Sequence, residues 1–79
     1  MVKLKEIRQA KGLSQSQLAE KAELNVRTLQ HYEQRSKIFD HARLDTILKC
    51  AIALECTIED IIDNEDYLNF IQKYQENQS

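Results

Sequence analysis

A chain of 79 residues with no proline and a single glycine has few positions at which its backbone can turn sharply. β-Sandwiches and barrels need many turns and strands rich in β-branched residues, whereas this sequence contains only two valines. We therefore predict an all-α fold. A chain this short forms one domain and needs a well-filled core, because it buries only about 60% of the surface that its unfolded form exposes.

Helical periodicity begins close to the N-terminus. Apolar residues three apart predict a first helix over Lys3 to Lys11, with Leu4, Ile7 and Ala10 on its buried face. Gly12 follows as the residue that ends this helix, because glycine favours the left-handed conformation found just beyond a helix.

Ser14 and Gln17 have the spacing of a capping box, which predicts that a second helix begins at Ser14. We expect Leu18, Ala19 and Ala22 on its buried face, where the small Ala19 allows another helix to approach closely.

Asn25 is a strong N-cap for a third helix, which follows the second after a link of about three residues. This helix should extend to about Glu33, with Leu29 and Tyr32 facing inward. Two short helices joined in this way predict a helix-turn-helix unit over about residues 14–34.

The second half of the chain continues the helical pattern. Ser36 to Asp40 is predicted to be a polar connection in which Ile38 and Phe39 pack against the core. A fourth helix should begin between Asp40 and Asp45. Its predicted apolar stripe has helical spacing and comprises Leu44, Ile47, Leu48, Ala51 and Leu54.

Two further caps precede the C-terminus. Thr57 and Asp60 form a capping pair that predicts a short helix through Ile61 and Ile62. Asn64 caps a last helix, whose final residues should fray, so we divide the chain into a domain over 1–63 and a C-terminal helix over 64–79. That helix has a wide apolar stripe, which consists of Tyr67, Leu68, Phe70, Ile71 and Tyr74.

The net charge of −2 conceals an asymmetry between the two parts of the chain. Up to Lys49 there are ten cations and six anions, a net charge of +4, and beyond it one cation and seven anions, a net charge of −6. This division predicts a basic working surface in the first part and an acidic C-terminal region.

The helix-turn-helix unit and the residues around it resemble a known family. The stretch Ser14 to Ala22 and the residues Leu24, Asn25, Leu29, Tyr32 and Glu33 are similar to the Cro/repressor-type (XRE) helix-turn-helix domain of bacteria and their phages. The resemblance covers roughly Leu4 to Ile62 and includes the ending formed by Leu54, Thr57 and Ile61. It implies a five-helix Cro/repressor-like (lambda repressor-like) DNA-binding domain, to which the C-terminal helix is added.

Two positions depart from the family pattern. The family usually has glycine in the turn between the second and third helices, where this chain has Glu23, and again two residues after Glu33, where it has Arg35. A non-glycine residue at positive φ costs about 1 kcal/mol, which a short turn tolerates or avoids by changing shape. The two departures leave the fold prediction unchanged. They affect the backbone conformation expected at Arg35.

The resemblance implies a recognition helix over about residues 25–33 that lies in the major groove of duplex DNA. The residues that it assigns to base contacts are Val26, Arg27, Thr28, Gln30 and His31. Those that it assigns to phosphate contacts are Gln15, Gln34, Arg35, Ser36 and Lys37. Arg8 and Glu33 match positions that pair across the first and third helices, which implies a structural ion pair. Without the motif, Arg27, Gln30 and His31 would be interpreted as an ordinary solvated helix face.

The side chains in the sequence do not indicate a catalytic site or a metal site. The sequence has no glycine-rich phosphate loop and no nucleophile beside an obvious base, and Glu59 and Asp60 point in different directions on a helix. Cys50 and Cys56 are interpreted as small core residues, because a structural zinc site needs four ligands and the only histidines are His31 and His41, the latter expected at the surface. We therefore expect no enzymatic activity, no metal and no cofactor.

The expected partner is duplex DNA, bound by a homodimer, because one short helix contacts too few bases for useful specificity. The predicted function is regulation of transcription, with the protein acting as a repressor. The alternative is an antitoxin-like interaction module that uses the acidic C-terminal region to bind another protein. The apolar stripe of the last helix fits both a dimer contact and closure of the protein's own core. No apolar run is long enough for a membrane span or a secretion signal, so we expect a cytoplasmic protein without a membrane partner.

Overall fold

The computed structural model describes residues 3–78, which form six α-helices and one 3₁₀ helix and contain no β-strand. The all-α prediction is therefore confirmed for the described part of the chain. Met1, Val2 and Ser79 lie outside the described residues. In chain order the elements are α1 (Lys3–Ala10), α2 (Gln15–Lys21), α3 (Val26–Gln34), α4 (Ser36–Asp40), α5 (Leu44–Leu54), the 3₁₀ helix η1 (Ile58–Asp60) and α6 (Glu65–Gln78).

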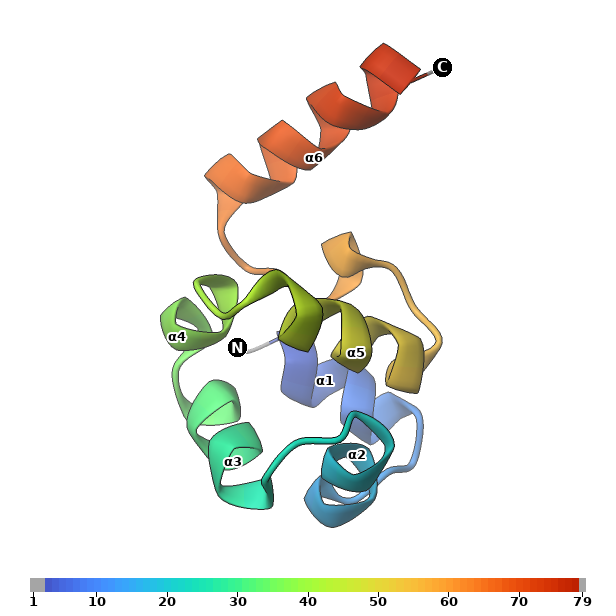
Figure 1. Ribbon diagram of the computed structural model, residues 1–79, viewed down its shortest axis with the longest axis vertical. Coiled ribbons are helices and arrows are strands. Elements are labelled where there is room, and N and C mark those ends of the chain that lie inside the picture. Colours follow the sequence, from blue (N-terminus) through green and yellow to red (C-terminus); the bar gives the residue numbers. More distant parts are fainter. Residues whose placement is uncertain (1–2, 79) are drawn as a thin grey trace.

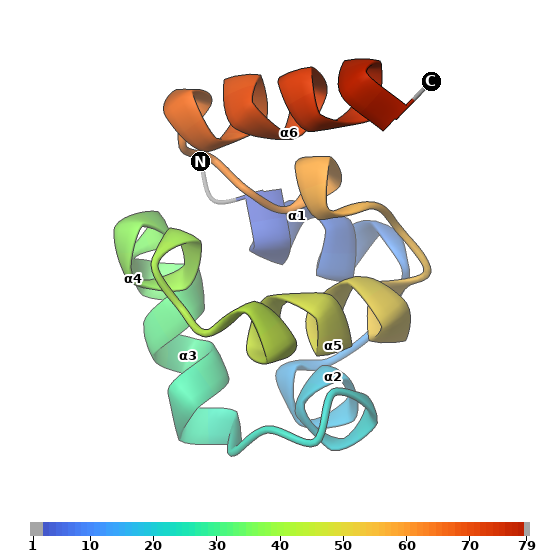
Figure 2. The same cartoon turned by 45° about the horizontal axis from the view of Figure 1, so that its top comes forward.

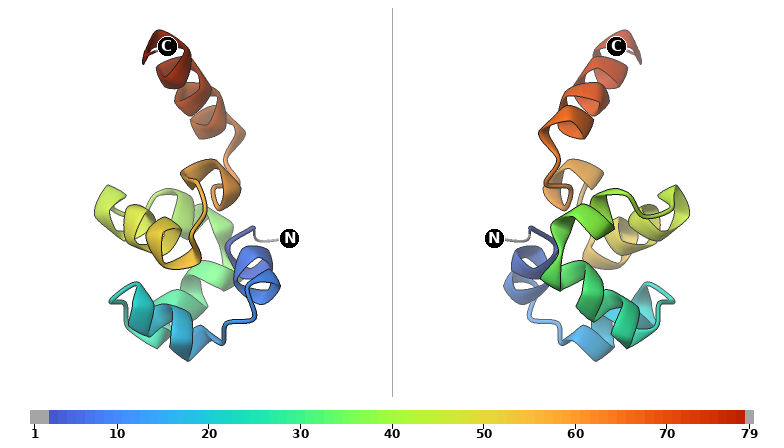
Figure 3. Two further views of the ribbon diagram at one scale, coloured as in Figure 1. Left: turned by 90° about the vertical axis from the view of Figure 1, so that its right-hand side faces the viewer. Right: turned by 90° about the vertical axis from the view of Figure 1, so that its left-hand side faces the viewer.

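The first five α-helices and η1 form a body from which α6 projects (Figure 1). Helix α3 packs against α1, α2 and α4, while α5 packs against α2 and η1. Helix α6 crosses the end of the body that carries η1, away from α2 and the start of α3 (Figure 2). This projection makes the molecule elongated, with extents of 37 × 21 × 21 Å. Figure 3 shows α1 and α5 on opposite sides of the body.

The core lies where α1, α2, α3, α5 and η1 meet, and most of its members follow the predicted faces. The buried apolar residues are Leu4, Leu18, Ala19, Ala22, Leu29, Phe39, Ile47, Cys50, Ala51, Leu54, Ile61 and Ile62. The ring of Phe39 meets that of Tyr32 edge to face, with centroids 5.3 Å apart. The predicted buried face of α2 and the inward position of Leu29 are confirmed.

Three helices end in the same backbone motif, in which the residue just beyond the helix adopts a left-handed conformation. Gly12 does so after α1 with φ +71°, as predicted, while Glu23 does so after α2 and Glu55 after α5, with φ of 57° and 54°. In each case the next amide donates to a carbonyl five residues earlier, as Leu24 does to Ala19 at 2.8 Å, which marks a Schellman motif. Glu23 therefore keeps the conformation that glycine would favour.

The segment Ser36–Asp40, predicted to be a polar connection, is instead the short helix α4. Phe39 is buried as expected, but Ile38 is exposed, so its predicted packing against the core is wrong. The reason is helical geometry, because two adjacent residues of a helix point about 100° apart and cannot both face the same core.

Helix α1 also differs from the prediction, since Ala10 is exposed. The inward direction of α1 is set by Leu4 and Arg8, which are four residues apart and both buried. Ile7 is only half-buried beside them. The charged residue Arg8 thus faces the core, whereas apolar periodicity had placed Ala10 on the buried face.

Helix α5 begins at Leu44, within the predicted interval, but its buried face is narrower than predicted. Ile47, Ala51 and Leu54 are buried, whereas Leu44 and Leu48 are exposed. The core approaches α5 from the side of Ile47 and Leu54, which leaves the other edge of the predicted stripe in solvent.

Helix α6 is held to the body by few contacts. Its side chains Tyr67, Leu68 and Ile71 are half-buried, while Phe70 and Tyr74 are exposed, so only part of the predicted stripe is covered. Hydrogen bonds from Tyr67 and Gln75 join it to the body. The Tyr67 hydroxyl lies 2.7 Å from His41 Nδ1, and Gln75 Nε2 donates to Glu59 Oε2 at 3.2 Å. The position of His41 beside Tyr67 had no signal in the sequence.

Candidate nucleic-acid interface

The two helices of the predicted unit begin at the residues that the sequence identified. The Ser14 hydroxyl accepts a hydrogen bond from the Gln17 amide at 3.1 Å, and the Gln17 side chain accepts one from the Ser14 amide at 2.8 Å. The predicted capping box of α2 is thus confirmed. At the start of α3, Asn25 Oδ1 accepts from the Arg27 amide at 2.8 Å, which confirms Asn25 as the N-cap.

Helix α3 turns one face to the core and another to solvent. Leu29 and Glu33 are buried, and Tyr32 is half-buried on the same side. Burial raises the pKa of the Tyr32 hydroxyl, which therefore stays protonated near neutral pH. The solvent face shares the helical spacing i, i+1, i+4, i+5 and i+8, and its exposed members are Val26, Arg27, Gln30, His31 and Gln34. Thr28 is half-buried at the edge of this face.

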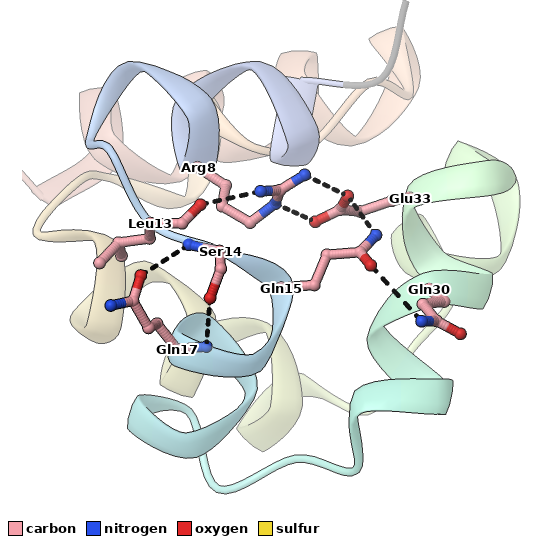
Figure 4. A network of polar contacts seen from close by, with 7 residues as sticks. All are labelled: Arg8, Leu13, Ser14, Gln15, Gln17, Gln30 and Glu33. Carbon is pink, nitrogen blue, oxygen red and sulfur yellow. Dashed lines mark hydrogen bonds and ion pairs between the residues drawn. The ribbon is translucent and has the colours of Figure 1, made fainter.

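A buried ion pair fixes α3 against α1. Arg8 Nε and Nη2 donate to the two carboxylate oxygens of Glu33, at 2.7 and 3.0 Å, while Arg8 Nη1 donates to the Leu13 carbonyl at 2.8 Å (Figure 4). A bidentate pair of this kind restricts rotation as well as distance. Removing one partner of a buried pair typically costs about 3–5 kcal/mol, since the other charge is left without compensation.

Gln15 extends this network to the solvent face of α3. Its Nε2 donates to Glu33 Oε1 at 3.1 Å, and its Oε1 accepts from Gln30 Nε2 at 3.5 Å (Figure 4). The side chain of Gln15, assigned by resemblance to a phosphate, is therefore oriented by the ion pair and lies beside a residue assigned to bases. Spacing along the sequence gave no signal for this link, because Gln15 and Glu33 are 18 residues apart.

The second group assigned to phosphates surrounds the junction of α3 and α4. Gln34, Arg35 and Lys37 are exposed and Ser36 is half-buried. Arg35 has φ −137° and ψ 100°, an extended conformation, so the chain avoids positive φ at this departure from the family pattern. The extended residue separates the two helices, so the four assigned residues lie at the junction of α3 and α4.

The cysteines belong to the core and not to this surface. Cys50 is buried, and its burial raises the pKa of its thiol to about 12, so the thiol is protonated at neutral pH. Cys56 is half-buried, and burial raises the pKa of its thiol as well. In the part of the chain that the structure describes, no three His, Cys, Asp or Glu side chains are grouped so as to hold a metal ion.

Comparison with known families agrees with this geometry. A family model described as helix-turn-helix matches residues 4–61, which extend from the second residue of α1 to just beyond η1. The chain belongs to the XRE-type helix-turn-helix family. The fold of this family is the Cro/lambda repressor-like fold, and its domains are DNA-binding regulators that are typically not enzymes.

The match ends before α6, so this helix-turn-helix protein carries a C-terminal helix beyond the family domain. No curated protein and no solved structure matches the chain. Within residues 3–78, none of the helices has the length and apolar character needed to cross a membrane.

Proposed function

We propose that this helix-turn-helix protein binds duplex DNA sequence-specifically and regulates transcription as a repressor. The observation that carries the proposal is the solvent face of α3, where Val26, Arg27, Gln30 and His31 project from a capped helix. The back of the same helix is anchored by the buried pair of Arg8 and Glu33. A rigid helix with a polar outer face is suited to insertion into the major groove.

The chemistry of each outer residue fits a base edge. Arg27 donates a pair of hydrogen bonds to O6 and N7 of guanine, and Val26 contacts the methyl group of thymine. Gln30 suits adenine, which offers one donor and one acceptor, and His31 donates to guanine or to a phosphate. Thr28, at the edge of the face, contacts a base or the adjacent backbone.

Phosphate contacts are assigned to the side chains that flank α3. Arg35 and Lys37 supply the positive charge, and Gln34 and Ser36 supply neutral donors at the same junction. Gln15 contacts a phosphate on the other side, with its amide already oriented by Glu33. Contacts of this kind position the protein on the duplex without selecting sequence.

The protein acts as a homodimer on a nearly palindromic site, because half-sites one helical turn apart multiply the discrimination of one short helix. We assign it to the cytoplasm, where bacterial duplex DNA lies. The domain over 1–63 carries the DNA contacts, and the segment over 64–79 contributes the C-terminal helix, which packs on the core or on a dimer partner.

Selection of bound duplexes from a random pool, performed with the full chain, tests the proposal directly. Enrichment of a sequence with two-fold symmetry supports specific binding by a dimer. Recovery of duplexes without any common sequence would contradict sequence-specific recognition by α3.

Exposed aromatic residues on α6 favour a second candidate function, that of an interaction module for another protein. Phe70 and Tyr74 are 62% and 63% exposed and lie one turn apart on the outer side of the acidic helix. An antitoxin-like subunit would combine this surface with DNA binding. The candidate predicts a protein ligand that is lost on changing Phe70 and Tyr74 to serine, and unchanged binding after both substitutions would contradict it.

A further inference from the structure

Helix α5 carries a stripe of three large apolar side chains in solvent. Leu44, Leu48 and Ile52 are 66%, 39% and 75% exposed, and each is four residues from the next. Single exposed apolar residues are common on protein surfaces and need no explanation. Three on successive turns of one helix face form a continuous patch, which we call the α5 stripe.

An open groove of ≈ 530 Å³ continues the α5 stripe toward η1. Its apolar lining includes Ala51, Cys56 and Ile58, and its charged lining residues are Glu55 and Asp60. Another molecule that covered the α5 stripe would therefore also contact the apolar surface beside Ile52.

The charged residues beside the α5 stripe are ordered so that two antiparallel copies of the helix would bring opposite charges near each other. Asp45 and Lys49 each follow a member of the stripe and lie along one side of it, four residues apart. If two copies of α5 meet antiparallel with Leu48 opposite Leu48, then Leu44 faces Ile52 of the other copy. In the same register Asp45 lies diagonally across from Lys49 of the other copy, two residues from the position directly opposite, and on the same side of the α5 stripe.

The ends of α5 show the same complementarity. Arg43 precedes the N-terminus and Glu55 follows the C-terminus, and each is at the end where the helix dipole disfavours its charge. Antiparallel pairing brings Arg43 of one copy near Glu55 of the other. Within the chain, Arg43 pairs with Asp45 at 3.3 Å and Lys49 with Glu23 at 3.6 Å, and both pairs are exposed to solvent.

We propose that the α5 stripe is the dimer interface, in which a second copy of this chain packs its own α5 antiparallel about a two-fold axis near Leu48. The inference deepens the proposed function, since it names the surface of the homodimer proposed there. A two-fold interface uses the same patch on both copies, so the patch must be complementary to itself in shape and charge. The stripe is small compared with standard interfaces, so the dimer is weak and reversible.

Helix α6 offers the competing apolar surface, Phe70 and Tyr74, but its charges do not complement one another. It carries one cation, Lys73, against three carboxylates, those of Glu65, Asp66 and Glu76. Each copy of α6 therefore has a net charge of −2, which disfavours self-association through this helix.

Sedimentation equilibrium of the full chain, without DNA, tests the interface. The unmodified chain should show a monomer–dimer equilibrium, and Ile52→Glu should weaken the dimer by about tenfold or more, because each substitution enters the interface twice. Phe70→Glu is the matched control, since Phe70 is similarly exposed but lies on α6, and it should leave the equilibrium unchanged. A chain that stays monomeric, or a dimer lost with Phe70→Glu and kept with Ile52→Glu, would overturn the proposal.

A charge exchange tests the antiparallel register. Asp45→Lys and Lys49→Asp alone should each weaken the dimer, because like charges then lie diagonally across from each other, and the double variant should recover most of the affinity. Circular dichroism verifies that each variant is folded. Failure of the double variant to recover the dimer would rule out this register. None of these readouts involves DNA, so loss of specific DNA binding would contradict the proposed function while leaving the interface intact.

Discussion

At the scale of single residues, Arg27 and Lys37 are both exposed cations near α3, but they are assigned different tasks. Arg27 lies in the first turn of α3, so Arg27→Ala should cost about 1–3 kcal/mol of specific binding and relax preference at one base position. Lys37→Ala should instead weaken binding to all sequences about equally. Titration of the selected duplex and of single-base variants distinguishes the two. Uniform weakening by Arg27→Ala would contradict its assignment to a base.

Asp40 is a buried carboxylate outside the candidate interface, and its Oδ1 accepts from the Asp63 amide at 3.1 Å. Burial raises the pKa of its carboxyl, an effect opposed by the backbone amides of Asp63 and Asn64. The folded state therefore binds this proton more tightly than the unfolded state does. The contribution of Asp40 to stability is fully present below the unfolded pKa of about 3.9 and is lost as the pH rises through the folded pKa.

This linkage predicts how Asp40→Asn behaves. The free energy of unfolding of the variant, minus that of the unmodified chain, should increase as the pH rises from below the unfolded pKa toward neutrality. Asparagine does not titrate, whereas the other carboxylates are common to both proteins and cancel. Urea denaturation over this pH range measures the difference. A difference that is constant or decreases with pH would contradict the assignment.

At the scale of elements, the Schellman motif that ends α2 contains Glu23 at a position with φ 57°. Glycine adopts this conformation without strain, so Glu23→Gly should be more stable than Glu23→Ala by about 1 kcal/mol. Alanine is the matched control, because both variants lose the exposed pair with Lys49 and only one removes the strain. Thermal unfolding compares them. Equal stabilities would mean that the left-handed conformation costs little here.

Helix α6 supplies no fully buried side chain, so the fold should not depend on it. A chain that ends at Asn64 should still unfold cooperatively, with a loss of about 1–2 kcal/mol from the partial exposure of the surface that Tyr67 and Leu68 cover. Circular dichroism during heating measures this loss. Leu54→Ala is the control for a core change and should cost about 2–5 kcal/mol. An unfolded truncated chain would show that α6 completes the core.

At the scale of the whole molecule, α6, which carries three carboxylates and one cation, lies at the opposite end from the turn between α2 and α3 (Figure 1). The net charge of −2 therefore says little about the surface proposed to meet DNA, where Arg27, Arg35 and Lys37 are exposed. This separation predicts modest non-specific affinity and strong reliance on the base contacts of α3.

Salt dependence tests the electrostatic part of this description. The logarithm of affinity should fall linearly with the logarithm of salt concentration, by about 0.9 for each phosphate neutralised. A dimer that presents Arg35 and Lys37 twice should give a slope of about −3 to −4. Lys37→Ala should reduce the magnitude of this slope by about 2. A flat response for every duplex would contradict DNA binding.

Local signals predicted most of the elements. The caps at Ser14, Asn25 and Asn64 depend on side chains that bond to amides two or three residues away, so their sequence spacing was enough to locate them. The exposure of Ala10 and Leu44 was not predictable in this way. Apolar periodicity tells which residues share a face, but not how much of that face a neighbouring helix covers.

Some features of the candidate site were likewise predictable from the sequence, and others depend on how the helices pack. The outer face of α3 follows from its cap and its helical period, and the ion pair of Arg8 and Glu33 was implied by resemblance and is present at 2.7 Å. The bridge from Glu33 through Gln15 to Gln30 depends on the angle between α2 and α3, which no local pattern encodes.

The sequence by itself determined the helical class, the positions of the caps, the helix-turn-helix unit and the separation of charge, because each depends on residues close together in the chain. Only the tertiary structure decided that Leu44, Leu48 and Ile52 remain in solvent, that Gln15 joins the buried ion pair, and that α6 stands apart from the candidate interface. These features depend on how distant helices pack, and packing angles are fixed by the fit of whole surfaces rather than by neighbouring residues.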